Sequence, residues 1–325
     1  MIRMAHGSGG KETEALVKSV FLKHFQNHAL GRLEDAAVIE MNGKAAFTTD
    51  SFVVTPLFFK GGDIGRLAVC GTVNDLLMMG ARPQYLSAGF IIEEGLPMET
   101  LDNVAASMAR TAAEAGVAIV AGDTKVIEGR GGLYINTSGI GTIPNGRDIG
   151  AAQVTSGDVI LVSGNLGDHH ACILSARMNI ENGIASDAMP LNRPVNALLG
   201  CGADVKAMRD VTRGGLATIL NEMCAASGTG AELEEASLPV SAQTAAFCEI
   251  LGLDSLYMGN EGKFVAIVKG EDGVIALDAL RSTPEGRSAM MIGRITDGKG
   301  VTLYTILGGR RRLSVLTGEG LPRIC

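Results

Sequence analysis

The most informative stretch of the sequence is Val117-Ala118-Ile119-Val120-Ala121-Gly122-Asp123-Thr124-Lys125. Its first five residues are apolar, which favours a buried strand, and an amphipathic helix is predicted directly before it, from Met98 to Ala115. The strand is predicted over Val117 to Ala121, and it ends on Gly122-Asp123-Thr124-Lys125. A helix leading into a buried strand with polar residues at its end is typical of α/β proteins, which gather their sites at such ends.

The rest of the chain mixes helices and strands in the same way. Further helices are expected over about 11–26, 64–79, 171–178, 216–226 and 272–281, and strands over about 36–39, 45–51, 84–92, 133–143, 159–163, 264–268, 291–295 and 301–306. The segment Pro144-Asn145-Gly146, with the loop to Gly157, is the best domain boundary. We therefore expect an α/β (α+β) fold of two mixed domains, in four parts: a glycine-rich loop and helix over 1–34, a first domain over 35–150, a second over 151–310 and a flexible tail over 311–325.

Composition and charge exclude several classes of protein. The 325 residues carry 28 Lys+Arg against 35 Asp+Glu, a net charge of −7, with one basic run at Arg310-Arg311-Arg312, so nucleic-acid binding is not expected. No apolar run reaches transmembrane length, and the first residues lack the apolar core of a signal peptide. We expect a cytoplasmic protein with no membrane partner. The six cysteines form no CxxC pair and the five histidines show no zinc spacing.

Four aspartates in the first half stand at or near the ends of predicted apolar elements: Asp35, Asp50, Asp75 and Asp123. Carboxylates that converge without a cation repel one another, whereas Mg²⁺ binds them as oxygen ligands together with nucleotide phosphates. The four residues therefore indicate a magnesium–nucleotide site. Taken singly, each is better explained as a helix cap or a turn residue.

Other polar residues are candidates for the same chemistry. Lys125 follows Asp123 by two residues, so both side chains would lie on one side of an extended segment, where the lysine could stabilise negative charge. Asp210 and Arg213 stand at a predicted helix start and suit phosphate, and Glu261 could act as a general base. Each has a structural alternative. Lys125 could be a solvated surface lysine, Asp210 a helix cap beside an exposed Arg213, and Glu261 an ordinary acidic residue of a turn. The loop His6-Gly7-Ser8-Gly9-Gly10 before a helix could hold a phosphate through the amides of Gly9 and Gly10.

The last four residues are Pro322-Arg323-Ile324-Cys325, preceded by the flexible run Thr317-Gly318-Glu319-Gly320. Such an arm could carry the thiol of Cys325 between sites. The alternative is a surface cysteine without a role.

Seven motifs together resemble the HypE family of hydrogenase maturation factors, and the match extends from end to end. They are His6-Gly7-Ser8-Gly9-Gly10, Thr49-Asp50-Ser51, Asn74-Asp75, Gly122-Asp123-Thr124-Lys125-Val126, Asp210-Val211-Thr212-Arg213-Gly214-Gly215, Asn260-Glu261-Gly262-Lys263 and the terminal Pro322-Arg323-Ile324-Cys325. This family is similar to aminoimidazole ribonucleotide synthetase, selenophosphate synthetase and thiamine-monophosphate kinase. The resemblance implies two α/β domains of that type and a homodimer, with residues 35–150 binding ATP and joining sheets across the interface.

The resemblance also implies a reaction and the residues for it. A HypF-like carbamoyltransferase would carbamoylate Cys325, and this protein would use ATP to dehydrate the S-carboxamide to a thiocyanate, giving ADP and phosphate. The cyano group would pass to iron on a HypC–HypD-like complex, as a cyanide ligand of [NiFe]-hydrogenase. By motif, Mg²⁺ would be held by Asp35, Asp50, Asp75 and Asp123; ATP would be held by these residues with Gly9, Gly10, Asn74, Asp210 and Arg213; Cys325, Lys125 and Glu261 would be catalytic.

Two other readings remain open. Selenophosphate synthetase carries its reactive residue in the N-terminal glycine-rich loop, where this chain has no cysteine, since the first is Cys70. Other ATP-dependent synthetases and kinases of the superfamily lack the cysteine-tipped tail. The alternative from another functional class is a non-catalytic carrier of the carbamoyl group. The four aspartates of the first half argue against it, because a carrier needs no Mg²⁺–ATP site.

Overall fold

The computed structural model describes residues 1–7, 11–30, 37, 39–144 and 146–316, and within these ranges the chain forms two α/β domains. The first is built on a four-stranded sheet in the order β1-β6-β4-β5, in which β4 and β5 are parallel and the other pairs antiparallel. Its strands are β1 (Ala45–Phe52), β4 (Arg82–Glu93), β5 (Ala118–Ile127) and β6 (Leu133–Thr142).

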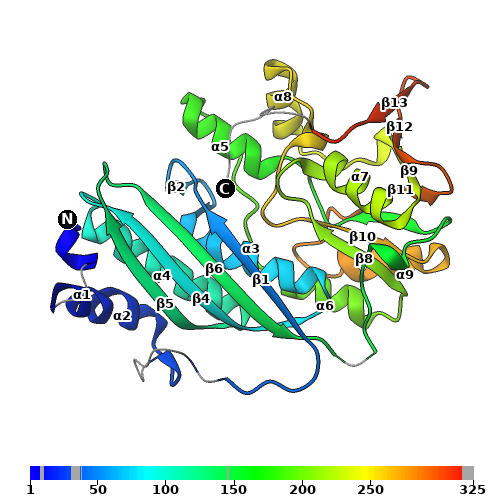
Figure 1. The fold of residues 1–325 in the computed structure, drawn as a ribbon. Helices are drawn as coiled ribbons and strands as arrows, with labels where there is room; N and C mark the ends of the chain where they lie inside the picture. Colours follow the sequence, from blue (N-terminus) through cyan, green and yellow to red (C-terminus); the bar gives the residue numbers. More distant parts are fainter. Residues whose placement is uncertain (8–10, 31–36, 38, 145, 317–325) are drawn as a thin grey trace.

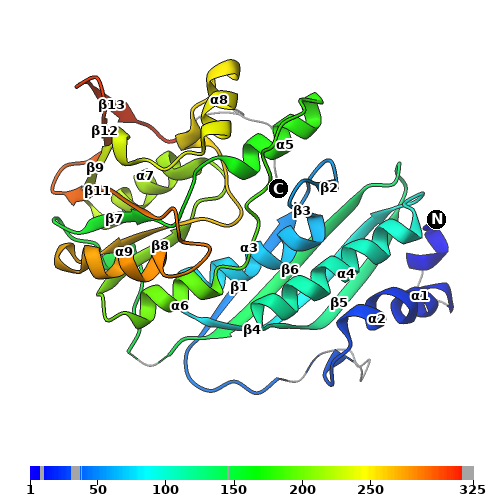
Figure 2. The same ribbon diagram turned by 180° about the vertical axis from the view of Figure 1, so that it is seen from behind.

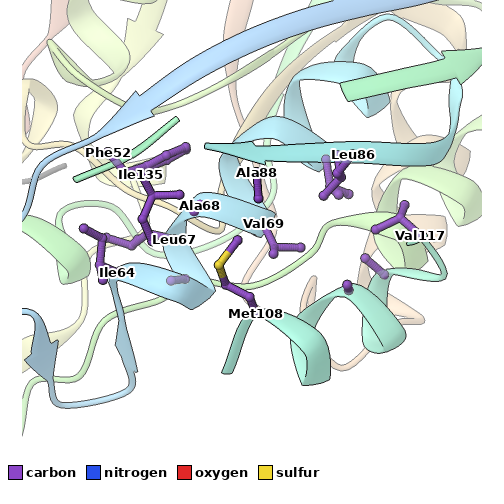
Figure 3. Close-up of a cluster of buried hydrophobic side chains, with 14 of the residues drawn as sticks. Phe52, Ile64, Leu67, Ala68, Val69, Leu86, Ala88, Met108, Val117 and Ile135 are labelled. Atoms are coloured by element: carbon purple, nitrogen blue, oxygen red, sulfur yellow. The ribbon is translucent and has the colours of Figure 1, made fainter. Parts of the chain in front are cut away.

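Two helices, α3 (Ile64–Met78) and α4 (Met98–Ala115), cover one face of this sheet (Figure 2). Helix α3 begins where the Asp63 side chain accepts hydrogen bonds from the amides of Gly65 and Arg66. It is apolar nearly all round because it packs against β1 and β6, against the neighbouring α4 and against β8 of the second domain. Figure 3 shows part of the resulting core, with side chains of α3, α4 and the strands in contact. Leu67 is fully buried, and truncating such a residue to alanine costs about 2–5 kcal/mol.

No helix or strand of the described ranges covers the opposite face of the sheet, which Figure 1 shows from the front. Phe47, on β1, is 71 % exposed there, and Ile91 on β4 and Ile127 on β5 are also exposed. Register places Ile91 beside Tyr134 and Lys125, whose side chains therefore share this face. An uncovered sheet face that exposes several apolar side chains is a candidate interaction surface.

The N-terminal segment packs beside α4. After the short turn η1 (Met4–Gly7), a continuous helix comprises α1 (Lys11–Leu16), the π-helical η2 (Val17–Phe21) and α2 (Leu22–Phe25). The ring of Phe21 lies 4.6 Å from that of Phe90 on β4, and Lys23 and His24 both contact the carboxylate of Asp102 on α4 at 2.9 Å. A small hairpin, β2 (Phe58–Phe59) and β3 (Gly62–Asp63), precedes α3.

The second domain contains a seven-stranded sheet in the order β13-β12-β9-β11-β7-β10-β8. All its strand pairs are antiparallel except β12 with β9. The strands are β7 (Val159–Val162), β8 (Val205–Asp210), β9 (Gly230–Glu234), β10 (Phe264–Val268), β11 (Met290–Thr296), β12 (Gly300–Tyr304) and β13 (Arg310–Leu313). Its helices are α5 (Asp168–Met178), α6 (Asn192–Gly200), α7 (Gly215–Ser227), α8 (Ala242–Leu251) and α9 (Gly273–Arg281), with single turns η4 (Ala151–Gln153), η5 (Glu235–Ser237), η6 (Ser255–Tyr257) and η7 (Gly270–Asp272).

Most predicted elements are confirmed, with some corrections. Strand β5 does not end at Ala121 but continues to Ile127, so Asp123 and Lys125 lie inside a strand. The strand predicted over 36–39 is not present at Ala37 or Ile39, and its other positions lie outside the described residues. Several elements were not predicted: the helices α6 and α8, the strands β8, β9 and β13, the small hairpin β2–β3 and the single turns. No helix in the described ranges is long and apolar enough to cross a membrane.

Candidate functional site

Asp50 and Asp75 lie where β1 meets α3. Asp50 is on the helix-covered side of β1, because its register partner Thr137 is fully buried. Asp75 projects from α3 toward the same strand, and its Oδ2 accepts a hydrogen bond of 2.8 Å from the hydroxyl of Thr48. Burial raises the pKa of Asp75, and the Asp50 carboxylate raises it further, while the Thr48 hydrogen bond lowers it.

The second domain adds a third carboxylate, Asp210, at the end of β8. Helix α3 packs against β8, so Asp210 lies near the other two aspartates. Burial raises the pKa of Asp210 to about 7, and the charges of Asp75 and Asp50 contribute, whereas the guanidinium of Arg209 lowers it. Burial also raises the pKa of Asp50. Three neighbouring carboxyl groups with raised pKa values form a site whose negative charge calls for a cation.

These oxygen donors fit Mg²⁺. In the part of the chain that the structure describes, no three acidic, histidine or cysteine side chains are close enough to hold one ion together. Magnesium sites at nucleotides commonly use one or two carboxylates and complete the coordination with phosphate oxygens and water. One or two of the carboxylates of Asp50, Asp75 and Asp210 therefore suit a cation that arrives with a phosphate group.

Arg213 and the two glycines after it stand next to this acidic cluster of Asp50, Asp75 and Asp210. Arg213 is exposed, and its charge lowers the pKa of Asp50. Gly214 and Gly215 both have positive φ values, 85° and 66°, and a Cβ on Gly215 would collide with the backbone of the 256–257 turn. Only glycine fits this entry to α7, which places the exposed arginine at the edge of the cluster.

Asp123 does not join the acidic cluster within one chain. Asp123 on β5 is paired with Gly89 on β4, which is paired with Asn136 on β6. Asp50 on β1 belongs to the next row across the sheet, which contains Thr137 and Ala88. Neighbouring rows of a sheet point to opposite faces, so Asp123 lies on the uncovered face and Asp50 on the helix side. The predicted convergence of Asp123 with Asp50 and Asp75 is wrong for the single chain.

Lys125 lies beside Asp123, as the spacing of two residues predicted. Its Nζ is 2.8 Å from Oδ2 of Asp123, and this contact lowers the pKa of the carboxyl. Both side chains are largely exposed, so the pair is a weak one energetically. It presents an exposed lysine on the uncovered face of the sheet.

Beside the edge strand β5 is a cavity of about 260 Å³ between the sheet and the N-terminal helix. Its walls are mostly apolar, and they include Phe21, Phe25 and Phe90 together with the polar groups of Asp123 and Thr124. A partly open, mostly apolar space of this size, bordered by residues of β5, suits a flat heterocycle.

Glu261 and Asn74 occupy the contact between the domains. Glu261 is 4 % exposed, on the segment between η6 and β10. The Asn74 amide donates to the carbonyls of Met189 and Glu261, at 3.1 and 3.4 Å, and its oxygen accepts from the amide of Leu191 at 2.9 Å. Asn74, predicted to bind the cofactor, thus uses both N–H donors to link α3 to the second domain.

Four predicted site residues lie outside the described residues: Gly9, Gly10, Asp35 and Cys325. Asp210, predicted as a nucleotide residue, lies near Asp50 and Asp75 in the structure. Thr48 was not singled out, although the run Thr48-Thr49-Asp50 on an alternating strand contained the signal.

Two family descriptions match the chain. The N-terminal domain of AIR synthase related proteins matches residues 33–143, and the C-terminal domain of the same family matches residues 155–306. Carbamoyl dehydratase HypE of Escherichia coli (strain K12) is 48 % identical over 335 residues, covering 100 % of this chain and 99 % of the relative.

Solved structures agree with these matches. A HypE crystal structure in complex with ATP has a TM-score of 0.96 and 45 % identity, covering 100 % of both chains. A HypE–HypF complex matches with a TM-score of 0.82 and 45 % identity, over 93 % of this chain and 100 % of that chain.

Proposed function

The chain belongs to the AIR synthase related proteins and, within them, to the HypE family, and on this basis we propose that it is an ATP-dependent carbamoyl dehydratase. Its substrate is an S-carboxamide on its own Cys325, and its products are a protein thiocyanate, ADP and phosphate. The observation that carries the proposal is the proximity of three carboxyl groups that influence one another's pKa, those of Asp50, Asp75 and Asp210, from three elements of two domains. A protein that only carried a carbamoyl group would need no such cluster.

The chemistry requires an activated oxygen. The amide oxygen is a poor leaving group, so it first attacks the γ-phosphorus of ATP and ADP departs, while one proton leaves the nitrogen. The carbon–oxygen bond then breaks and phosphate departs with the bonding electrons. The second nitrogen proton is removed, and the C≡N bond forms. Bound Mg²⁺ would neutralise phosphate charge at Asp50, Asp75 and Asp210, with Asp35 as a further proposed ligand.

The remaining roles follow the motifs. Glu261 would accept a proton from the nitrogen, and Lys125 would stabilise the developing negative charge. The phosphates of ATP would be contacted by Arg213, Gly9 and Gly10. The apolar cavity beside Asp123 offers room for the adenine ring. We assign residues 35–150 to ATP binding and dimerisation, 151–310 to the second domain, and 311–325 to a tail that presents Cys325.

We further propose a homodimer in which the uncovered faces of two four-stranded sheets meet. The exposed Phe47, Ile91 and Ile127 support this, since burying them gains about 25 cal/mol per Å². Asp123 and Lys125 lie on the same face, so dimerisation would bring them from one protomer toward the other. Such an arrangement would give Asp123 and Lys125 access to a site that they do not reach in one chain.

The proposed partners are a HypF-type carbamoyltransferase, which would supply the carbamoyl group, and a HypC–HypD-type complex, which would accept the cyano group as an iron ligand of [NiFe]-hydrogenase. The crystal structure of a HypE–HypF complex supports the first partner.

Mass spectrometry of the C-terminal peptide tests the activity, after incubation with the carbamoyltransferase, carbamoyl phosphate and ATP. We expect Cys325 to gain one carbamoyl group and then to lose one water. The Asp75→Asn variant should gain the carbamoyl group and retain the water. An unmodified Cys325 while ATP is consumed would point instead to a small-molecule kinase or synthetase.

A further inference from the structure

Glu261 is held through its backbone by a buried aspartate. Its N–H donates a hydrogen bond of 2.9 Å to Oδ1 of Asp187, and its carbonyl accepts the bond from Asn74. Asp187 is 7 % exposed. The position of the Glu261 main chain is therefore set from two sides, by α3 of the first domain and by Asp187 of the second.

Asp187 is paired with Lys263, two residues after Glu261. The Lys263 Nζ lies 3.3 Å from Oδ2 of Asp187, and both side chains are more than nine-tenths buried. Nζ donates a hydrogen bond to the carbonyl of Gly262, while Oδ2 accepts none. A buried ion pair with an oxygen that accepts no hydrogen bond costs desolvation energy, so such a pair is weak evidence for a role in stability.

Two glycines let the backbone approach this pair closely. A Cβ on Gly262 would collide with the carbonyl oxygen of Asp187, and a Cβ on Gly164 would lie 2.9 Å from Cε of Lys263. The absence of side chains at these two positions allows the 261–263 segment to pass directly against Asp187.

The segment that carries Asp187 is anchored on both sides. Before it, the Ser186 hydroxyl lies 2.8 Å from Nδ1 of the buried His169, and the Ser186 amide donates to the carbonyl of Lys60 at 2.8 Å. After it, the Met189 carbonyl accepts a hydrogen bond from the Asn74 side chain, and the Leu191 amide donates one to the Asn74 side-chain oxygen. Asp187 is thus a fixed acceptor rather than a flexible one.

We propose that Asp187 is a positioning residue for Glu261, held in place by the charge of Lys263. The inference rests on the proposed dehydration, in which Glu261 removes a proton. Asp187 fixes the Glu261 main chain through Oδ1, and Lys263 keeps the carboxylate oriented, so that the Glu261 carboxylate meets the substrate in one geometry. Neither Asp187 nor Lys263 takes part in proton transfer itself.

The test compares two double variants that lack both charges and have similar shapes. Asp187→Asn with Lys263→Met keeps an oxygen acceptor for the Glu261 N–H, whereas Asp187→Leu with Lys263→Met does not. Single-turnover dehydration of carbamoylated full-length protein at saturating ATP should slow by about 10–100-fold in the leucine variant, and by less than about fivefold in the asparagine variant. The KM for ATP should change by less than about twofold in both, because the acidic cluster is untouched.

Combination with Glu261→Gln separates positioning from a general structural role. In the Glu261→Gln background, adding Asp187→Leu with Lys263→Met should lower the dehydration rate by less than a further factor of about two. Glu261, through which Asp187 acts, is already disabled there. Equal rates in the two folded double variants, or a full additional loss in the Glu261→Gln background, would overturn the inference.

Two controls complete the design. Glu271→Gln removes an exposed partner of Lys269 and should leave the rate unchanged. If the leucine variant does not fold, Asp187→Ala with Lys263→Met replaces it in the same comparison. Failure of the wild-type protein to dehydrate Cys325 would instead refute the proposed function, an outcome visible before any variant is made.

Discussion

The hydroxyl of Thr48, on β1, donates a 2.8 Å hydrogen bond to Oδ2 of Asp75, on α3. This bond joins the sheet to its main helix at the acidic cluster. It also opposes the burial that raises the pKa of Asp75, so Thr48 helps to keep that carboxylate ionised.

Thr48→Val should therefore weaken the binding of Mg²⁺–ATP. Without the hydroxyl the pKa of Asp75 rises further, because the hydrogen bond that favours the charged carboxylate is lost. We expect the dissociation constant to increase by about 3–10-fold, measured by calorimetry. Thr302→Val, on β12 of the second sheet, is the matched control. Equal affinities of wild type and Thr48→Val would contradict the assigned role.

Asp210 should make the stability of the nucleotide-free protein fall as pH rises. Its pKa is about 7 in the folded protein against 3.8 for the unperturbed group, so between these values the folded state binds more protons than the unfolded state. The free energy of unfolding should then be larger at pH 5 than at pH 7.5, by on the order of 1–4 kcal/mol from this group. Urea unfolding at both pH values measures this. Asp210→Asn should flatten the dependence, and an unchanged slope in that variant would show that other groups cause it.

Asn74→Ala should loosen the contact between the domains. The substitution removes three hydrogen bonds and leaves the carbonyls of Met189 and Glu261 and the amide of Leu191 without that partner. A loss of about 2–4 kcal/mol is expected, seen as a lower midpoint in thermal or urea unfolding. Asn103→Ala, at an exposed position of α4, should change stability by less than about 0.5 kcal/mol. Similar values for both variants would argue against the linking role.

Phe47→Asp should disrupt the proposed dimer. A charge at this exposed position of β1 would be buried between the two sheets, at a cost of several kcal/mol. Light scattering coupled to size-exclusion chromatography should show a dimer for the wild type and a monomer for the variant. Leu307→Asp, at the 96 % exposed tip between β12 and β13, should remain a dimer. A wild-type protein that is monomeric at micromolar concentration would count against the interface.

Elements whose pattern is local were predicted well. The helix from Met98 to Ala115 has the predicted bounds, because its apolar side chains repeat with the helical period and Gly116 ends it in a left-handed conformation. Strand β8, in contrast, reads Val205-Lys206-Ala207-Met208-Arg209-Asp210, a run of mixed polarity. It is a strand because it pairs with the fully buried β10, a contact between segments more than fifty residues apart.

The motifs in the sequence were sufficient to identify the two-domain α/β fold and the family, and they nominated candidate residues for its chemistry. They could not assign those residues to one surface. Asp123 was grouped with Asp50 because both follow apolar runs, yet the alternation of side chains along β5 and β1 puts them on opposite faces. Asp210 joins Asp50 and Asp75 only because α3 packs against β8. The partners of a charged residue depend on strand register and long-range packing, and neither leaves a signal in the residues next to it.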